Sequence, residues 1–521
     1  MPGKVLFVSN RVFRGLVLQH RRIDRMITTI KRYLFLVLSA LFISSAAFAN
    51  NVTVSNVTMT GQDATNDFVF VKFDTSWENS WRTSSAPNNW DAVWVFVKYK
   101  VGSGDWQHAI LSATAGNHTA PSGSTITPSS DGKGVFIYRS ADGSGTVSLS
   151  DVKLRWHYGT NGVADDAQVT LDVFATEMVY VPTGSFSAGS GGTEDTPFTL
   201  TTINTGSVTQ AGGFPTGQTA PGSDSWPNGY TAFYCMKYNI TQEQYVDFLN
   251  TLGRTQQDTR TATNLASGQT AITNRYVMSN NSSMQIRNGI RCDATIPATG
   301  TITFYCDFNG NGTGGESDDG QNIACGYLNW ADGAAYADWA ALRPMTELEF
   351  EKACRGTAAA VANEYAWGST SGTQTAAITN SGFGSETTST SGANFVYGSH
   401  ASVQGPMRAG CFATASSTRV GAGATYYGIM EMSGNLLKRC VTIGNADGRS
   451  FTGSHGNGAL NSTGDADASS WPGTSASGAG FRGGHWFNPA TYARVSERSE
   501  ASYADSARFH YYGFRCVRLA P

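Results

Sequence analysis

Residues 480–516 have the sequence GFRGGHWFNPATYARVSERSEASYADSARFHYYGFRC, with a Gly/Phe/Arg block at each end. Glycine permits backbone conformations and close approaches that a Cβ forbids, and buried phenylalanine rings anchor chain segments. The residues between the two blocks follow neither the period of 2 of a strand nor the period of 3.6 of a helix. A polar and aromatic segment fixed at both ends predicts a binding face; an ordinary C-terminal loop and strand is the alternative.

We expect this segment to contact a macromolecular ligand, either a protein or a glycan. Aromatic residues give a large contact area at a small cost in conformational entropy, and short polar residues adapt their hydrogen bonds. The candidate ligand-binding residues are His485, Phe487, Asn488, Pro489, Tyr492, Ser499, Glu500, Ser502, Tyr503, Asp505, Ser506, Phe509, His510 and Tyr511.

The composition is typical of a β-rich, loop-rich extracellular protein. The length of 521 residues predicts two or three domains. Hydrophobic residues make up 40% of the chain and charged residues only 14%, and there are 59 glycines. The formal net charge is -3 and no basic stripe occurs, so we expect no nucleic acid as a partner.

Residues 1–49 predict a leader that contains a secretory signal peptide. Lys31 and Arg32 precede an apolar run over residues 33–43, and small residues leading to Ala49 form a cleavage site. Met26 is a better start for this signal than the first residue. No later apolar run reaches about 18 residues, so we expect no transmembrane anchor. The sequence therefore predicts a protein that is secreted or displayed at the cell surface.

Residues 50–176 predict an antiparallel β-sandwich domain. Short strand-like segments, separated by turn residues, occupy residues 68–73, 93–99, 134–138, 152–156 and 169–174. No catalytic constellation occurs in this part. We expect a spacer or docking module, or a structural unit that assembles with copies of itself.

Residues 177–521 predict a larger α+β domain with three helices. Residues 239–249 have an amphipathic pattern, with Thr241 as the N-cap and Gln244 completing a capping box. A second helix is expected over residues 330–341. A third follows Pro344, with Thr346 as its cap and Glu349 as the partner of that cap.

Several strings in this larger domain resemble the formylglycine-generating enzyme (sulfatase-modifying factor) family. They lie at residues 177–186, 239–250, 342–351, 365–368, 432–435, 481–484 and 513–516. The resemblance implies a C-type-lectin-like fold over residues 177–521. It also implies copper-dependent oxidation of a cysteine in a sulfatase, carried out with two cysteines shortly after the Gly-Gly pair.

The chain departs from this family where the chemistry would occur. The two cysteine positions hold Asn488 and Ala493, and His485 stands where a serine usually follows the Gly-Gly pair. Neither Asn nor Ala supplies the thiolate that copper chemistry requires. In residues 434–439, Lys438 replaces a side chain that the family has available for calcium. We therefore expect the fold without the reaction, no enzyme activity and no bound copper.

The tail also resembles the variable proteins that retroelements diversify. Residues 481–486, 494–498 and 512–515 carry this resemblance, which implies a lectin-like fold that displays a mutable C-terminal region over residues 481–516. Diversification turns AAC codons into NNC codons, which never encode Lys, Glu, Gln, Trp or Met. Most candidate ligand-binding residues belong to the permitted set, and Glu500 is the exception.

A calcium loop is predicted upstream of the second helix. Asp307, Asn309 and Asn311 stand at positions 1, 3 and 5, Gly follows at position 6, Thr313 offers a carbonyl at position 7, and Asp318 is the acid at position 12. The twelfth residue is usually Glu, and no helices flank the loop, so a surface turn rich in Asn and Gly is the alternative.

All eight cysteines lie from Cys235 onward, and no C-x-x-C motif occurs. In an oxidising compartment some of them are expected to pair, and Cys292 and Cys306 are the closest couple. Free buried cysteine is the alternative.

Three functions remain open on the sequence. The first is a ligand-binding protein, adhesin-like or receptor-like, with a diversified C-terminal face. The second is a copper-dependent formylglycine-generating oxidase that acts on sulfatases, and the third is a structural subunit of a surface assembly.

Overall fold

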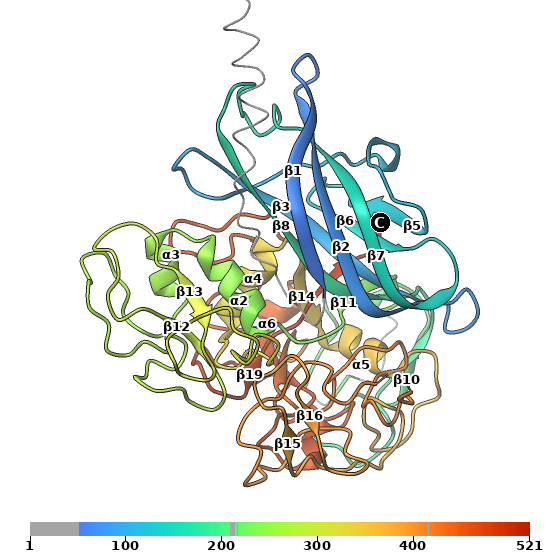
Figure 1. Ribbon diagram of the computed structural model, residues 1–521. Coiled ribbons are helices and arrows are strands. Elements are labelled where there is room, and N and C mark those ends of the chain that lie inside the picture. Colours follow the sequence, from blue (N-terminus) through green and yellow to red (C-terminus); the bar gives the residue numbers. More distant parts are fainter. Residues whose placement is uncertain (1–51, 209–213, 216, 415) are drawn as a thin grey trace, which may run out of the picture.

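The computed structural model describes residues 52–521, apart from residues 209–213, 216 and 415 (Figure 1). The leader predicted over residues 1–49 lies outside the described residues. Within the described part, no helix is both long enough and apolar enough to cross a membrane.

The first 130 or so described residues form strands and short connections. The strands are β1 (Thr53–Asp63), β2 (Phe68–Arg82), β3 (Asp91–Val101), β4 (Gln107–His108), β5 (Ser124–Pro128), β6 (Val135–Arg139), β7 (Gly143–Trp156) and β8 (Val169–Val181). A 3-10 helix covers Ala115–Asn117. All five expected strands are present, and β2, β7 and β8 extend well beyond their predicted ends.

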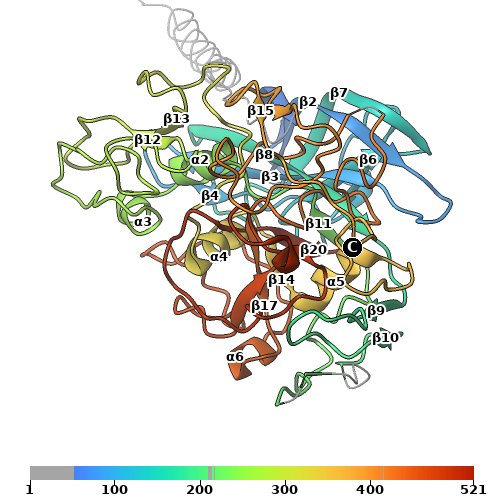
Figure 2. The same ribbon diagram turned by 90° about the horizontal axis from the view of Figure 1, so that it is seen from below.

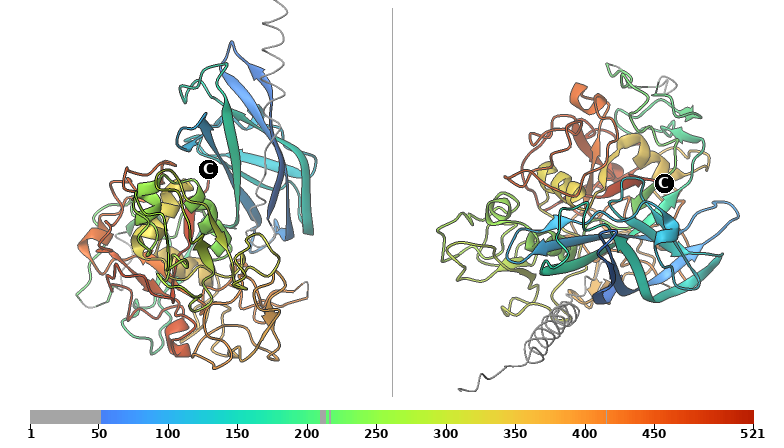
Figure 3. Two further views of the ribbon diagram at one scale, coloured as in Figure 1. Left: turned by 60° about the vertical axis from the view of Figure 1, so that its left-hand side comes forward. Right: turned by 90° about the horizontal axis from the view of Figure 1, so that it is seen from above.

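These strands form two layers with a shared apolar core. Strands β1, β2 and β7 make a three-stranded antiparallel sheet, and β3, β5, β6 and β8 belong to a second, larger sheet. Val71 and Phe73 of β2 pack in one cluster with Val93 and Val95 of β3. Figure 3 shows the strands of residues 52–181, in blue and teal, gathered at one side of the molecule.

Strand β3 is buried on both faces. Val93 and Val95 point toward the three-stranded sheet, whereas Trp94 and Phe96 point the other way, into the core of the remainder of the chain. A strand covered on both sides needs apolar residues at successive positions rather than alternate ones. The run VWVFV over residues 93–97 meets this need.

The larger sheet continues without a break into the second half of the chain. Its strand order is β18-β17-β14-β20-β11-β8-β3-β6-β5, with β19 paired to β17 and β4 to β3. Residues 91–101 of β3 pair with residues 169–179 of β8, and residues 178–181 of β8 pair with β11. The predicted boundary between residues 176 and 177 therefore falls inside β8, and the two predicted domains share one sheet.

The second half of the chain adds short strands, helices and long loops to this sheet. Its strands are β9 (Phe186–Ala188), β10 (Thr201–Ile203), β11 (Phe233–Met236), β12 (Ile290–Cys292), β13 (Phe304–Cys306), β14 (Arg343–Thr346), β15 (Ile378–Thr379), β16 (Thr387–Thr388), β17 (Leu437–Val441), β18 (Ala479–Arg482), β19 (Tyr512–Gly513) and β20 (Cys516–Leu519). Its helices are α2 (Gln242–Asn250), α3 (Arg254–Thr259), α4 (Trp330–Trp339), α5 (Glu347–Arg355) and α6 (Ala446–Arg449). A 3-10 helix covers Ala490–Ala493.

The three expected helices are confirmed together with their caps. Thr241 and Gln244 form a capping box at α2, and Thr346 and Glu349 form one at α5. Helices α4 and α5 both contact β14 and lie to either side of it (Figure 2). The chain is thus α+β and rich in sheet, while the C-type-lectin-like fold and the β-sandwich stay predictions.

All eight cysteines are buried and free, which corrects the expected pairing of Cys292 with Cys306. These two residues lie on neighbouring strands, but Cys292 is opposite Phe304 and Cys306 is opposite Ile290. Their side chains are therefore offset along the ladder instead of facing each other.

Candidate ligand-binding face

Helix α5 supplies the anchor for the C-terminal segment. Thr346 caps the helix, and Arg343 binds the partner of that cap, Glu349, in a bidentate pair with distances of 2.8 and 2.6 Å. Glu347 and Glu351 lie four residues apart and so project from one face of the helix. Both are fully buried, which requires positive partners.

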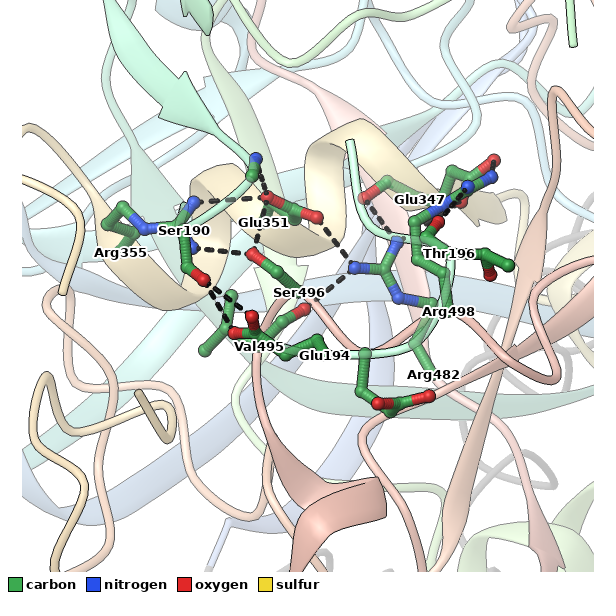
Figure 4. A network of polar contacts seen from close by, with 12 residues as sticks. Ser190, Glu194, Thr196, Glu347, Glu351, Arg355, Arg482, Val495, Ser496 and Arg498 are labelled. Carbon is green, nitrogen blue, oxygen red and sulfur yellow. Dashed lines mark hydrogen bonds and ion pairs between the residues drawn. The ribbon is translucent and has the colours of Figure 1, made fainter. Parts of the chain in front are cut away.

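Those partners come from the two sides of the Gly-Gly pair, as Figure 4 shows. Arg482 lies 3.1 Å from Glu347 Oε2 and 2.7 Å from Glu351 Oε1, and it also donates to the carbonyl of Val495 at 2.7 Å. Arg498 Nε lies 2.7 Å from Glu347 Oε2. Burial alone would raise the pKa of Glu347, but the two guanidinium groups hold that pKa below its ordinary value. The start and the middle of the segment are thus fixed to one helix.

The Gly-Gly pair is required by its surroundings. Gly483 has a φ of 80° and Gly484 a φ of 59°. A Cβ on Gly483 would lie 2.2 Å from the carbonyl oxygen of Met432, and one on Gly484 would lie 2.9 Å from the amide nitrogen of Ala493. Any side chain at these positions would push the segment off its support.

The far end of the segment is fixed in the same way. The Phe514 ring lies so close to Gly333 of α4 that a Cβ on this glycine would be 1.8 Å from the ring. Arg515 donates to Asn239 Oδ1 at 2.7 Å and to the carbonyl of Met430 at 2.6 Å. Both Gly/Phe/Arg blocks are therefore buried framework.

Aromatic side chains between these anchors reach the surface. Phe487 is 54% exposed, Tyr503 is 57% exposed and Phe509 is 41% exposed. Half-buried Tyr511 lies between Phe509, at a ring distance of 5.5 Å, and His485, at 4.2 Å. Beneath them Trp486 is buried, with 2% of its surface accessible.

The structure places the predicted ligand-binding residues at three depths. Exposed are Phe487, Pro489, Ser499, Ser502, Tyr503, Ser506 and Phe509. Half-buried are Asn488, Tyr492, Glu500, Asp505, His510 and Tyr511, and His485 is buried.

His485 and Asp505 support the surface rather than extend from it. His485 Nδ1 accepts a hydrogen bond from the Phe487 amide at 3.1 Å. Burial, with smaller contributions from His510 and Lys438, lowers the pKa of His485 to about 3, so the ring is neutral. The Asp505 carboxylate accepts hydrogen bonds from the Tyr512 hydroxyl at 2.6 Å and from the amide of Ala507 at 2.7 Å. Their direct contact with a ligand is thus limited.

Two basic residues of β17 contact this region. The sequence patterns predicted a supporting role for neither of them. Arg439 lies 4.0 Å from the centre of the Phe481 ring and 4.7 Å from that of Tyr512, and it donates to the carbonyl of Asp505 at 2.6 Å. Lys438 is fully buried and donates to the carbonyl of Gly434 at 2.6 Å. The partners of Arg439 lie 42 or more residues away in the sequence, so no local signal identifies its role.

The two positions at which the family resemblance places cysteines differ in their surroundings. Asn488 follows the exposed Phe487, and its carbonyl accepts a hydrogen bond from the amide of Gly398 at 2.8 Å. Ala493 is buried in a cluster with Tyr365, Trp367 and Phe395. Elsewhere in the chain, burial raises the pKa of all eight cysteine thiols; for Cys292 it is raised to about 11. These thiols are protonated at neutral pH.

The predicted calcium loop connects β13 to the segment before α4. Asp307 is buried, forms an ion pair with Arg291 and accepts hydrogen bonds from the amides of Gly310 and Gly312. Asn309 donates to Asp318 Oδ1 at 3.1 Å and to Glu316 Oε2 at 3.2 Å. Asn311 and Thr313 are exposed, and the Asn311 amide oxygen accepts a hydrogen bond from the Thr313 amide.

The acidic residues that gather in this loop differ from the predicted ligand set. Oxygen atoms of Glu316, Asp318 and Asp319 lie within 4.8 Å of one another, and Asp319 Oδ1 is buried without a hydrogen-bond partner. Of the two acids among the five predicted ligands, Asp318 belongs to this group, whereas Asp307 pairs with Arg291. Calcium binding by this loop stays a prediction.

The fold and the framework around the C-terminal segment define a sheet-rich α+β protein of one recognisable family. The sequence model of the sulfatase-modifying factor enzyme 1-like domain matches residues 167–520, so the chain belongs to this family. The match begins just before β8 and includes α5, the Gly-Gly pair and the terminal Gly-Phe-Arg block. No curated protein matches the chain.

Proposed function

We propose that this chain binds a macromolecular ligand, a protein or a glycan, through the exposed side chains of residues 485–511, and that it catalyses no oxidation of cysteine. One observation carries the proposal. Three large aromatic side chains, Phe487, Tyr503 and Phe509, are exposed on a segment whose ends and middle are clamped by buried ion pairs and close glycine contacts. We call the seven exposed residues among the predicted ligand-binding residues, together with half-buried Tyr511, the aromatic face.

The concentration of apolar surface supports a binding role. In the described part of the chain, eight large hydrophobic side chains are exposed, and three of them belong to the aromatic face. Exposed aromatic rings cost solubility unless they serve an interaction. Serine, asparagine and proline accompany them, which is a composition suited to an adaptable binding surface.

The clamped framework supports a face that tolerates substitution. Residues that anchor the segment, such as Arg482, Trp486 and Arg498, are buried, while the residues between them are not. Exposed substitutions usually change stability by less than about 0.5 kcal/mol. Such an arrangement suits the diversified C-terminal region of the retroelement variable proteins that the tail resembles.

The absence of a suitable thiol argues against the family's oxidation reaction in this chain. Asn488 and Ala493 occupy the two cysteine positions, and the eight thiols elsewhere are buried, with raised pKa values. Lys438, a basic residue, is fully buried and donates to the carbonyl of Gly434 where the family has a side chain available for calcium. A binding protein with an inherited framework accounts for these features.

Export to the cell surface or medium is part of the proposal. It rests on the leader predicted over residues 1–49 and on the extracellular type of composition. A surface location would place the aromatic face in contact with proteins and glycans outside the cell.

The test uses the triple variant Phe487→Ser/Tyr503→Ser/Phe509→Ser. The purified chain is screened against an array of glycans and against a phage-displayed peptide library, and the ligands retained by the wild type are then tested with the variant. The variant is expected to lose them, because a few central aromatic residues carry most of the energy of an interface. A matched control replaces exposed side chains elsewhere: Leu200→Ser/Phe383→Ser/Val420→Ser.

The control should keep every ligand at wild-type affinity. Undiminished binding by the aromatic-face variant, or equal loss in the control, would place the binding surface elsewhere. Failure of the wild type to retain any ligand in either screen would also count against the proposal.

A further inference from the structure

A cavity of about 270 Å³ lies between β8, α2 and β13, far from the aromatic face in the sequence. Three carboxylates line it: Asp172 from β8, and Glu243 and Asp247 from α2. Glu243 and Asp247 lie four residues apart, so they project from the same face of their helix. Helix α2 lies against β13 (Figure 2). Residues of β13 also line the cavity.

These acids are not an ordinary solvated helix face. Asp247 is only 9% exposed, and among the described residues no group donates a hydrogen bond to its carboxylate or pairs with it. A charge run on a helix is usually exposed to water, whereas an unpaired buried carboxylate is costly. The Asp247 carboxyl group therefore either stays protonated or needs a positive partner.

None of the residues described as lining the cavity is Lys, Arg or His. Lys98 is the register partner of Asp172, but its ammonium group donates to the carbonyls of Trp339 and Gly458 at 2.8 and 2.7 Å. Lys100 lies over the outer wall, 5.0 Å from the centre of the Trp106 ring. The three carboxylates therefore lack a cation supplied by the cavity walls.

The pKa values of the cavity carboxyl groups reflect their burial and mutual repulsion. Burial, followed by repulsion from Glu243 and Asp172, raises the pKa of Asp247 well above its ordinary range. Burial also raises the pKa of Asp172 to about 7 and raises that of Glu243, whose carboxylate contacts the Cys306 thiol. Tyr305 and Cys306 are the other titratable groups of the wall, and burial raises the pKa of both.

The walls favour an organic cation over a bare metal ion. In the described part of the chain, the one group of His, Cys, Asp or Glu residues whose ligand atoms all lie within 4.8 Å of one another is Glu316, Asp318 and Asp319. The three cavity carboxylates do not form such a group. The rest of the lining includes Trp106, Phe174 and Phe304, whose rings suit a carbon chain and attract an ammonium group.

We propose that this cavity binds a small alkylammonium compound, with its charged nitrogen at Asp247, in the electrostatic field of Asp172 and Glu243, and its carbon chain against Phe174 and Phe304. The proposal does not depend on the function of the aromatic face. The cavity volume suits a ligand smaller than a typical drug molecule.

The experiment titrates the full chain with 1,4-diaminobutane by isothermal calorimetry, with butan-1-ol and calcium chloride as parallel probes. Asp247→Asn and Glu243→Gln are each expected to weaken binding of the diamine by about tenfold or more, because each removes a charged hydrogen-bond acceptor. The control is Asp166→Asn, an exposed acid outside the cavity, which should leave the affinity within about twofold.

The pH dependence has a defined sign. A carboxyl group with a raised pKa is protonated below that pKa and binds a cation only after losing its proton. Affinity for the diamine should therefore rise between pH 5.5 and pH 8, through the pKa of about 7 at Asp172. Binding should also release protons to the buffer.

Four results would overturn the proposal: no binding of the diamine at pH 8, equal binding by Asp247→Asn and the wild type, equal binding of butan-1-ol, or an affinity that falls as the pH rises. Binding of calcium that Asp247→Asn abolishes would replace the organic cation with a metal ion and would equally contradict it. Asp247→Asn should keep the wild-type melting temperature, since it removes an unpaired buried acid, so loss of binding is separable from unfolding.

Discussion

The ion-pair framework around α5, formed by Glu347, Glu351, Arg482 and Arg498, holds the segment that carries the aromatic face. The two regions differ in which kind of side chain is buried and which is exposed. In the framework, Glu347 and Glu351 are fully buried and each is paired with arginine. In the face, Phe487 and Phe509 leave roughly half of their surfaces in contact with solvent. The framework places charge inside the protein, and the face places aromatic rings outside it.

This difference separates the residues that fix the segment to the protein from the residues that the segment exposes to a ligand. Buried ion pairs fix geometry because each charge must keep its partner, so they tolerate little change. Exposed rings contribute little to folding and are free to vary. A protein built in this way can alter its binding surface while keeping its fold.

The largest expected effect comes from breaking the framework at Glu347. Replacement by Gln leaves the guanidinium groups of Arg482 and Arg498 without their shared carboxylate, in a buried site. We expect a loss of about 3–5 kcal/mol in the free energy of unfolding, measured by denaturant titration. Arg494→Ala is the control, because this half-buried arginine donates to Asn363 and contacts Tyr365, neither of which is a buried carboxylate. A Glu347→Gln variant as stable as the control would contradict the framework role.

A pair of adjacent aromatic residues tests the same contrast within the segment. Trp486 is buried and Phe487 is exposed, although they are neighbours in the chain. Trp486→Ala is expected to cost about 3–5 kcal/mol, and Phe487→Ala less than about 0.5 kcal/mol. Thermal unfolding of the two variants side by side measures the difference. Equal melting temperatures of the two variants would show that burial does not distinguish the anchoring residues from those of the aromatic face.

A smaller change in stability is expected if the acidic loop binds calcium. If the loop binds calcium, free calcium at 100 times the dissociation constant should stabilise the chain by about 2.7 kcal/mol, and chelator should reverse this. Asp318→Asn is the better probe than a change at Asp307, because Asp307 also pairs with Arg291. The variant should abolish the response to chelator. A melting curve of the wild type that chelator leaves unchanged would favour the surface turn.

No turnover is expected from the region that replaces the family's cysteines. Incubating the purified chain with copper and a sulfatase peptide that contains cysteine should yield no aldehyde, because Asn488 and Ala493 supply no thiolate. Mass spectrometry of the peptide detects the product. Formation of aldehyde above the level seen with heat-denatured protein would make the chain an oxidase and contradict the proposed function.

Local sequence patterns were enough to predict α2, α4 and α5, but not the short helices α3 and α6. Thr241 and Thr346 cap α2 and α5 as expected, because a capping box involves residues three positions apart. Strand β1 was missed, since its polar residues weaken the alternation along an edge strand. The continuity of the sheet through β8 was also missed, because strand pairing depends on distant residues.

The depth of individual side chains could not be read from the sequence. His485 was expected on the surface and is buried beneath Tyr511, while Glu347 was part of a recognised motif without a known partner. Its ion pair with Arg482 joins residues 135 positions apart. Only the folded chain brings such partners together.

The central claim is that the face varies independently of the framework, and one measurement tests it directly. A display library randomised at Phe487, Pro489, Ser499, Tyr503, Ser506 and Phe509 is sorted for resistance to protease, which reports folding. Most members are predicted to remain as resistant as the wild type while differing in the ligands that they retain. If most members are instead degraded, the exposed residues are required for the fold, and the separation between face and framework is wrong.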